Sequence, residues 1–177
     1  MLGGWSIDPQ VYDWIRENVP DGSTILELGS GNGTDALSKH YTMYSIEHNE
    51  RFVGRFKSTY IHAPMKGHWY DLDVLERELE PLWGKYDVIL IDGPIGNESK
   101  YRIGFWENIT LFNANVLLIF DDTNRDGERL LFDKCLDYVN FDFGIGEELP
   151  EAEKRTFKRF EKFSVIFPAK GLEISNK

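Results

Sequence analysis

The hydrophobic residues of this chain form short continuous runs, which alternate with stretches whose apolar positions recur every three or four residues. The runs predict strands at residues 24–28, 43–47, 60–63, 86–91, 116–120, 141–145 and 163–167. The helical spacing predicts helices at about residues 9–19, 34–39, 49–55, 72–82 and 126–138, with a weak helix or a loop at 101–110. Strands and helices are therefore expected to alternate along most of the chain.

Strands that alternate with helices and are apolar throughout are typical of a parallel sheet covered by helices on both faces. We therefore expect an α/β fold of the Rossmann-like kind, with a doubly wound sheet. The length of 177 residues suits one domain, which is expected to span residues 1–177.

Particular residues refine three of these elements. Asp8 before Pro9 predicts a capped start of the first helix. The charged stretch at residues 147–158 predicts a loop. The side chains expected to face the core from the helix near the end of the chain are Leu130, Leu131, Cys135 and Leu136.

The charge balance limits what the protein binds. With 20 basic and 30 acidic residues the net charge is −10, whereas binding to a nucleic-acid backbone needs clustered Lys and Arg. No apolar run reaches the ~20 residues that cross a bilayer, and the first residues lack the layout of a signal peptide. The single cysteine, Cys135, excludes an internal disulfide. We expect a cytoplasmic protein whose partner is a small molecule rather than a nucleic acid or a membrane.

The segment ILELGSGNGT carries the most informative motif. A buried strand with one acid, Glu27, ends in three glycines at alternate positions, Gly29, Gly31 and Gly33. Glycine allows a positive φ and a close approach of a ligand to the backbone. The spacing differs from the GxGxxG fingerprint of dinucleotide-binding proteins, because the third glycine comes one residue early.

The E-x-G-x-G-x-G pattern of this segment resembles motif I of the class I S-adenosylmethionine (SAM) methyltransferases. The resemblance covers about residues 8–168. It implies a mostly parallel seven-stranded sheet with an antiparallel edge strand. It also implies that Glu27 and the glycine loop, Ser30 included, face the methionine end of SAM.

Further cofactor-binding residues are expected at the ends of the second and third strands. Glu47 comes 18 residues after the first glycine, and an acid at about this distance accepts hydrogen bonds from ribose hydroxyls. The resemblance also implies that the adjacent His48 contacts the cofactor. In GHWYDLD, Asp71 would accept from adenine, and Tyr70 or Trp69 would stack on it. Asp71 has a second interpretation as the N-cap of the next helix, and both interpretations can hold together.

Three carboxylates follow two strands that should be neighbours. Asp92 ends the strand at 86–91, and Asp121 and Asp122 end the strand at 116–120. The layout resembles the metal-dependent O-methyltransferases of the caffeoyl-coenzyme A and macrocin types. That resemblance implies that the three carboxylates hold Mg²⁺ or Ca²⁺, which would bind two substrate hydroxyls. It also implies that Asp92 and Asp121 take part in catalysis, and that Asp92 contacts SAM.

Two departures from those enzymes leave the general base unassigned. The macrocin type has a second aspartate where this chain has Pro94, and the lysine of the caffeoyl type has its nearest counterpart at Lys100. A competing interpretation is that Asp92 and Asp121 serve SAM or cap helices while no metal binds. Weaker candidates for the site are His40, His62, His68, Arg102, Asn124 and Arg125.

The expected function is SAM-dependent transfer of a methyl group to a hydroxyl of a small molecule, with a sugar as acceptor and Mg²⁺ assistance as the finer expectation. Two alternatives stay open. One is a non-catalytic SAM-binding or interaction domain. The other is a different transferase on the same fold, such as an aminopropyl transferase.

Overall fold

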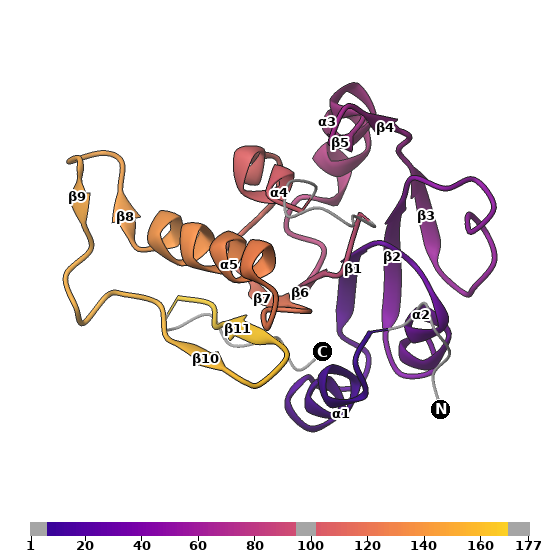
Figure 1. The fold of residues 1–177 in the computed structure, drawn as a ribbon, viewed down its shortest axis with the longest axis horizontal. Coiled ribbons are helices and arrows are strands. Elements are labelled where there is room, and N and C mark those ends of the chain that lie inside the picture. The colour runs from indigo at the N-terminus through magenta and orange to yellow at the C-terminus, as the bar shows by residue number, and fades with distance from the viewer. Residues whose placement is uncertain (1–6, 95–101, 170–177) are drawn as a thin grey trace.

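The computed structural model describes residues 7–94 and 102–169. Its main strands are β1 (Thr24–Leu28), β2 (Thr42–Glu47), β3 (Thr59–His62), β6 (Val88–Ile91), β7 (Leu117–Phe120), β10 (Phe157–Arg159) and β11 (Ser164–Ile166). They form one sheet in the order β10-β11-β7-β6-β1-β2-β3 (Figure 1). Two small sheets accompany it, β4 (Met65–Lys66) with β5 (Trp69–Tyr70) and β8 (Phe141–Asp142) with β9 (Glu147–Glu148).

The centre of the main sheet is parallel, from β3 through β2, β1 and β6 to β7. β11 runs antiparallel to β7, and β10 runs antiparallel to β11, so a hairpin closes this side of the sheet. The predicted fold class, a doubly wound and mostly parallel sheet of seven strands with an antiparallel edge, is confirmed.

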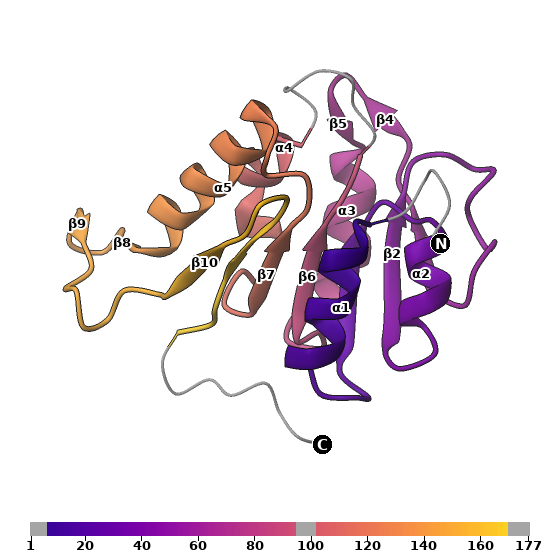
Figure 2. The same cartoon turned by 60° about the horizontal axis from the view of Figure 1, so that its bottom comes forward.

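Helices cover both faces of the sheet (Figure 2). They are α1 (Pro9–Asn18), α2 (Asn32–Leu37), α3 (Leu72–Leu79), α4 (Gly104–Glu107) and α5 (Asp126–Val139), with the 3₁₀ turns η1 (Glu80–Leu82) and η2 (Ile109–Leu111). α1 and α2 lie on one face, and α3, α4 and α5 lie on the other (Figure 1). None of the helices in the described part of the chain is long and apolar enough to cross a membrane.

The central strands bury side chains on both faces, because successive residues of a strand point to opposite sides. In β6, Ile89 and Ile91 join the core under α3, α4 and α5, whereas Val88 and Leu90 join the core under α1 and α2. This double burial explains why the strands are apolar throughout. It also explains why the charged side chains of these central strands lie at or near the strand ends.

Two predicted details of the helices are confirmed and one is wrong. Asp8 caps α1, since its Oδ1 accepts the N–H of Gln10 at 2.9 Å. Cys135 is fully buried in α5, as is Leu131. Leu130, predicted to face inward, is 52% exposed, because one residue along a helix turns the side chain by about 100° away from its buried neighbour.

Residues 49–55 form turns instead of the predicted helix. The Oδ1 of Asn49 accepts the N–H of Arg51, and such a local bond competes with helix formation. Gly54 has a φ of 74°, which a right-handed helix excludes. Local turn chemistry therefore overrides the apolar spacing here.

The predicted strand at residues 141–145 does not join the main sheet. Its first two residues pair with β9 in a separate hairpin, because the Oδ1 of Asp142 accepts the N–H of Gly144 at 2.8 Å and Gly146 takes a φ of 76°. The outer strand of the sheet is β10, which begins inside the stretch predicted as a loop at 147–158. All three β10 residues are exposed, so no apolar pattern marks this strand in the sequence.

Buried Arg155 fixes the chain before the edge hairpin. Its guanidinium donates to the carbonyl oxygens of Phe167, Ala114 and Val116, and burial lowers its pKa to about 10. Arg155 thereby joins the segment that leads into β10 to the start of β7 and to the chain after β11.

We expect Arg155→Ala to lower the free energy of unfolding by about 3 kcal/mol, because three carbonyl oxygens lose a charged donor. Urea denaturation followed by circular dichroism measures the loss. The matched control is Arg77→Ala, whose exposed guanidinium pairs with Glu78 and which should cost about 0.5 kcal/mol or less. Equal losses in the two variants would contradict the anchoring role of Arg155.

Candidate functional site

The carboxyl ends of β1, β2, β6 and β7 meet along one edge of the sheet, and the predicted site residues lie there. Backbone hydrogen bonds fix their relative positions. The N–H of Asp92 donates to the carbonyl oxygen of Leu28 at 3.2 Å, and the N–H of Asp121 donates to that of Ile91 at 3.1 Å. Ligands of open α/β sheets bind at this edge, so the acids stand where a ligand would arrive.

The glycine loop between β1 and α2 packs directly against the turn after β6. Gly29 has a φ of 85°. A Cβ placed on Gly93 would lie 2.7 Å from the amide nitrogen of Gly29, and a Cβ on Gly33 would lie 2.9 Å from Cγ1 of Ile7. Gly29 and Gly93 therefore serve close backbone packing, and Gly33 leaves room for the side chain of Ile7, in addition to the ligand approach that the motif predicts.

Glu27 lies behind the glycine loop and holds it in place. Its Oε1 accepts the hydroxyl of Thr34 at 2.6 Å and the hydroxyl of Ser45 at 2.5 Å. Thr34 Oγ1 in turn accepts the N–H of Gly31 at 3.0 Å. Burial raises the pKa of Glu27 to about 7, against the lowering effect of the two hydroxyl donors. The carboxylate thus links the loop, the start of α2 and β2.

Glu47 connects the end of β2 to the same loop. Its Oε2 accepts both the N–H of Ser30 at 3.0 Å and the Ser30 hydroxyl at 2.7 Å. Its Oε1 accepts the N–H of Asn49 at 2.8 Å and lies 3.2 Å from Nδ1 of His48. Glu47 therefore stands beside the glycine loop, as its predicted role with the cofactor requires.

Tyr70 brings a buried hydroxyl into this neighbourhood. Burial raises its pKa well above the usual value, and the charge of Glu47 is the next contribution. The hydroxyl has no hydrogen-bond partner within the described residues. Most buried polar atoms in proteins are hydrogen-bonded, so the Tyr70 hydroxyl is a candidate contact for a ligand.

Asp71 and Trp69 have structural roles. Asp71 caps α3, because its Oδ1 accepts the N–H of Asp73 at 3.1 Å, and it pairs with Lys66 at 3.0 Å. Trp69 is buried, and a Cβ on Gly104 would lie 2.3 Å from its ring. The capping interpretation of Asp71 is confirmed, while contacts of Asp71 and Trp69 with adenine stay predictions. A cavity of about 470 Å³ lies beside them.

Asp121 is engaged by the backbone. Its Oδ1 accepts the N–H of Asp122 at 2.8 Å, and its Oδ2 accepts the N–H of Asp8 at 3.2 Å. Burial, and then the charge of Asp122, raise the pKa of Asp121 to about 6. The carboxylate joins the end of β7 to the start of α1.

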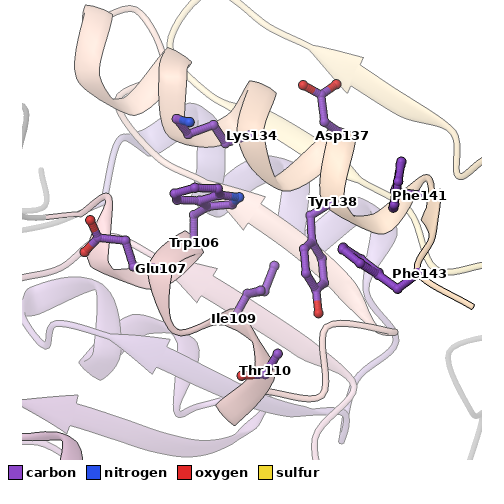
Figure 3. A pocket seen from close by; sticks show the side chains of 9 residues that line it. All are labelled: Trp106, Glu107, Ile109, Thr110, Lys134, Asp137, Tyr138, Phe141 and Phe143. Carbon is purple, nitrogen blue, oxygen red and sulfur yellow. The ribbon is translucent and has the colours of Figure 1, made fainter. Parts of the chain in front are cut away.

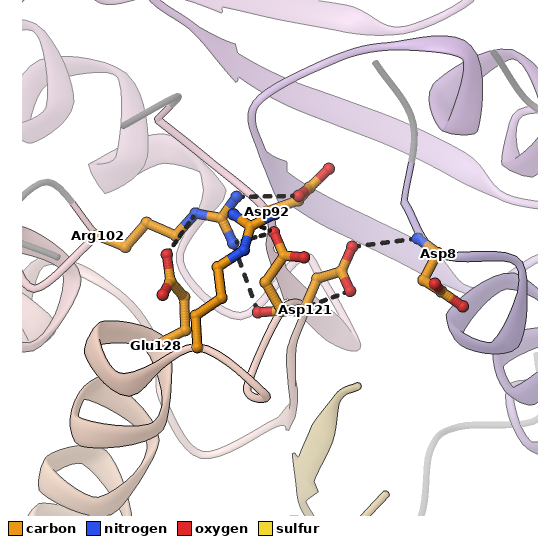
Figure 4. A network of polar contacts seen from close by, with 7 residues as sticks. Asp8, Asp92, Arg102, Asp121 and Glu128 are labelled. Atoms are coloured by element: carbon orange, nitrogen blue, oxygen red, sulfur yellow. Dashed lines mark hydrogen bonds and ion pairs between the residues drawn. The ribbon is translucent and has the colours of Figure 1, made fainter. Parts of the chain in front are cut away.

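Arg102 lies at the centre of the acidic cluster (Figure 4). One guanidinium nitrogen is 3.3 Å from Oδ1 of Asp92, and another is 3.2 Å from Oδ2 of Asp122. The guanidinium also donates to the carbonyl oxygen of Asp121 at 3.4 Å, and Glu128 lies 3.9 Å from Nε. Burial raises the pKa of Asp92 well above its usual value, and Arg102 opposes that shift.

The carboxylates of Asp92, Asp121 and Asp122 meet the first condition for a metal site, since one ligand atom from each lies within 4.8 Å of the others. Oxygen ligands of this kind suit Mg²⁺ and Ca²⁺. The guanidinium of Arg102, however, already binds two of the three side chains. A metal here stays a prediction. Lys100, the nearest counterpart of the lysine in the caffeoyl type, lies outside the described residues.

The remaining candidates are mostly remote or paired. His40 lies 3.9 Å from Asp21, which belongs to the loop before β1. Both residues are therefore at the amino ends of the parallel strands, opposite the predicted site. His68 bonds to Glu107 at 2.8 Å. Arg125 is 56% exposed and pairs with Asp122. The side chains of His62 and Asn124 are exposed.

A second cavity, of about 670 Å³, lies between α4, η2 and the end of α5 (Figure 3). Its aromatic walls are Trp106, Tyr138, Phe141 and Phe143. None of the predicted site residues lines it.

Comparison with known proteins identifies the fold. No family model and no curated protein match the chain. A Clostridium thermocellum protein that carries the provisional name of rRNA methylase is 13% identical, with a TM-score of 0.50, over 95% of this chain and 98% of its own. Aeropyrum pernix fibrillarin, in complex with natively bound SAM, is 14% identical, with a TM-score of 0.50, over 89% of this chain and 72% of its own. The fold is therefore that of the SAM-dependent methyltransferases. Neither protein supports the finer resemblance to metal-dependent O-methyltransferases.

The raised pKa of Glu27 makes the stability of the fold depend on pH. The folded protein holds this proton up to about pH 7, whereas an unburied glutamate loses it near pH 4.5. The stabilising contribution is complete below the unfolded pKa and is lost as the pH rises through the folded one, which amounts to about 3 kcal/mol. Urea denaturation at about pH 5 and about pH 7.5 should therefore show a smaller decline for Glu27→Gln than for the wild type.

The control for this measurement is Glu76→Gln, an exposed position of α3. It should retain the wild-type profile. If Glu27→Gln declines with pH as steeply as Glu76→Gln, Glu27 does not carry the proton that the fold holds.

Proposed function

We propose that this chain is a SAM-dependent methyltransferase that transfers a methyl group to a hydroxyl of a small molecule, with a sugar as the first class to test. The observation that carries the proposal is the arrangement of residues at the carboxyl ends of the parallel strands, which we call the carboxyl edge of the sheet. There the glycine loop, Glu47 and Asp92 adjoin one another on a fold that SAM-bound fibrillarin shares.

The residues at this edge fit SAM. Glu47 accepts three hydrogen bonds, two from Ser30 and one from Asn49, and a carboxylate has about four lone-pair sites, so it retains capacity for a ribose hydroxyl. The Tyr70 hydroxyl has no partner among the described residues. The loop at Gly29 and Gly31 would hold the methionine part. SAM, when bound, supplies an electrophilic methyl group on a sulfonium.

Charge at the edge favours a cation and disfavours an anionic acceptor. Three carboxylates, those of Asp92, Asp122 and Glu128, lie within 3.9 Å of the guanidinium groups of Arg102 and Arg125, and the carboxylate of Asp121 lies beside them. Negative charge is left in excess, and a nearby cation would relieve it. A sulfonium meets that need, whereas the phosphates of a nucleic acid would add to the repulsion. This field tolerates a neutral hydroxyl compound as the methyl acceptor.

Asp92 is the carboxylate best placed to receive the proton of the acceptor hydroxyl. Asp121 is engaged by two backbone N–H groups, and Asp122 pairs with two arginines. Asp92 pairs with Arg102 and is 28% exposed. Burial raises the pKa of Asp92, which makes its carboxylate a stronger proton acceptor. Mg²⁺ or Ca²⁺ would use the same oxygens and would compete there with Arg102.

A cationic polyamine would also suit the excess negative charge, which makes an aminopropyl transferase the second candidate. A non-catalytic SAM-binding domain would keep Glu47 and the loop but would give no product. Binding measurements and product analysis separate these three functions.

SAM should bind in a one-to-one ratio, and Glu47→Ala should weaken binding by roughly 1.5–3 kcal/mol, the range for a hydrogen bond to a charged group. Isothermal titration calorimetry measures both. Glu50→Ala, an exposed position in the turn after β2, is the control and should bind like the wild type. Binding of NAD without binding of SAM would contradict the cofactor.

Methyl-labelled SAM identifies the acceptor class. Labelled product from hydroxylated small molecules, and none from RNA or from polyamines, is the expected result. Label in RNA would contradict the acceptor class. Product from decarboxylated SAM with a polyamine would identify the aminopropyl transferase, and SAM binding without any product would identify the binding domain.

Tyr70→Phe should separate cofactor binding from folding. The variant removes a buried hydroxyl that lacks a partner among the described residues, so the free energy of unfolding without ligand should stay equal or rise, by up to about 1 kcal/mol. The affinity for SAM should fall by about 1 kcal/mol if the hydroxyl bonds to the cofactor. Thermal melts with and without SAM measure both effects. A stability loss without any change in SAM affinity would place the hydroxyl in the folded core instead.

A further inference from the structure

Arg102 holds the oxygens that a divalent cation would need. Its guanidinium lies 3.3 Å from Oδ1 of Asp92 and 3.2 Å from Oδ2 of Asp122, two members of the three-carboxylate cluster (Figure 4). A Mg²⁺ or Ca²⁺ ion would have to approach such oxygens to about 2.0–2.6 Å. An ion and a guanidinium bound to the same oxygens would stand close together with like charge.

The third carboxylate of the cluster has its own partners. Both oxygens of Asp121 accept backbone N–H groups, from Asp122 at 2.8 Å and from Asp8 at 3.2 Å. These two contacts fix the direction of the Asp121 side chain and occupy one lone-pair site on each of its oxygens. The cluster therefore offers a metal fewer free ligands than its count of acids indicates.

Arg102 also suits a permanent place at this edge. Its side chain is 10% exposed, and it bonds to the carbonyl oxygen of Asp121 as well as to the acids. An arginine stays charged at every working pH, and its planar group binds several oxygens at once. Removing one partner of a buried ion pair leaves uncompensated charge, so Arg102 is not readily displaced.

We propose that Arg102 is a built-in cation that takes the place of a divalent metal at the carboxyl edge and positions Asp92 and Asp122 there. The assignment rests on the proposed function for its catalytic meaning, since it makes the methyl transfer independent of Mg²⁺ and Ca²⁺. Arg102 is a positioning residue in this scheme, because it acts through the carboxylates it holds.

The test compares thermal melts of the wild type, Arg102→Met and Arg125→Met, each with chelator and with millimolar Mg²⁺, Ca²⁺ or Mn²⁺. Arg125→Met is the matched control, because Arg125 also pairs with Asp122, at 2.9 Å, but from the surface. The wild type and Arg125→Met should shift by less than about 1 °C, whereas Arg102→Met should gain roughly 5 °C or more with at least one metal. The double variant Arg102→Met with Asp122→Asn should lose that gain.

A wild-type shift as large as that of Arg102→Met would overturn the proposal, as would equal shifts in the two arginine variants or no shift in a folded Arg102→Met. The wild-type comparison needs no variant to fold. If Arg102→Met folds only with added metal, as seen by circular dichroism, the proposal is supported. If it fails to fold under all conditions, Arg102→Gln replaces it in the same comparison. All these results are independent of SAM, so a failure of the proposed function would appear separately, in calorimetry.

Discussion

The carboxylates crowded at the carboxyl edge of the sheet need partners that offset their charge, and the structure of this edge depends on that constraint. Parallel strands bring their ends together, and in this chain those ends carry acids that water only partly reaches. An uncompensated buried charge costs several kcal/mol. The structure meets this cost with backbone N–H groups at Asp121, with hydroxyls at Glu27 and with a guanidinium at Asp92 and Asp122.

These compensating contacts also build the scaffold of the site. The hydroxyl of Ser45 in β2 donates to Glu27, which also accepts the hydroxyl of Thr34 and through it holds the glycine loop. Glu47 fixes the same loop from its other side through Ser30. Asp121 ties α1 to β7 through the N–H of Asp8. Each contact joins separate elements of the fold, so polar contacts as well as apolar packing fix the position of the loop relative to the strand ends. A ligand that bound at these strand ends would meet a loop that is already held in place.

The sequence predicts the central sheet well because both of its faces are buried, which leaves long apolar runs between polar turns. It fails where that signal is missing. The exposed strand β10 carries no apolar alternation, and the hairpin after α5 depends on turn contacts around Asp142. In the site, the glycine motif and the strand-end acids could be found from spacing. Arg102 is only a weak candidate in the sequence, because a single arginine carries no pattern and its partners come from the ends of β6 and β7 and from α5. Ser45 offers a faint sequence signal, because a hydroxyl side chain inside a buried strand indicates a polar partner, which here is Glu27.

Acids that look alike in the sequence have different roles because their surroundings differ. Glu27 and Asp121 are turned toward the protein's own donors and act as structural links. Glu47 holds the loop yet keeps acceptor capacity, and Asp92 is partly exposed with an arginine beside it. An acid such as Asp92, which is held by one arginine through one oxygen, keeps lone pairs that could take a proton while its direction stays fixed. Strand-end position alone therefore does not separate these acids, whereas the burial of each carboxylate and the partners around it do.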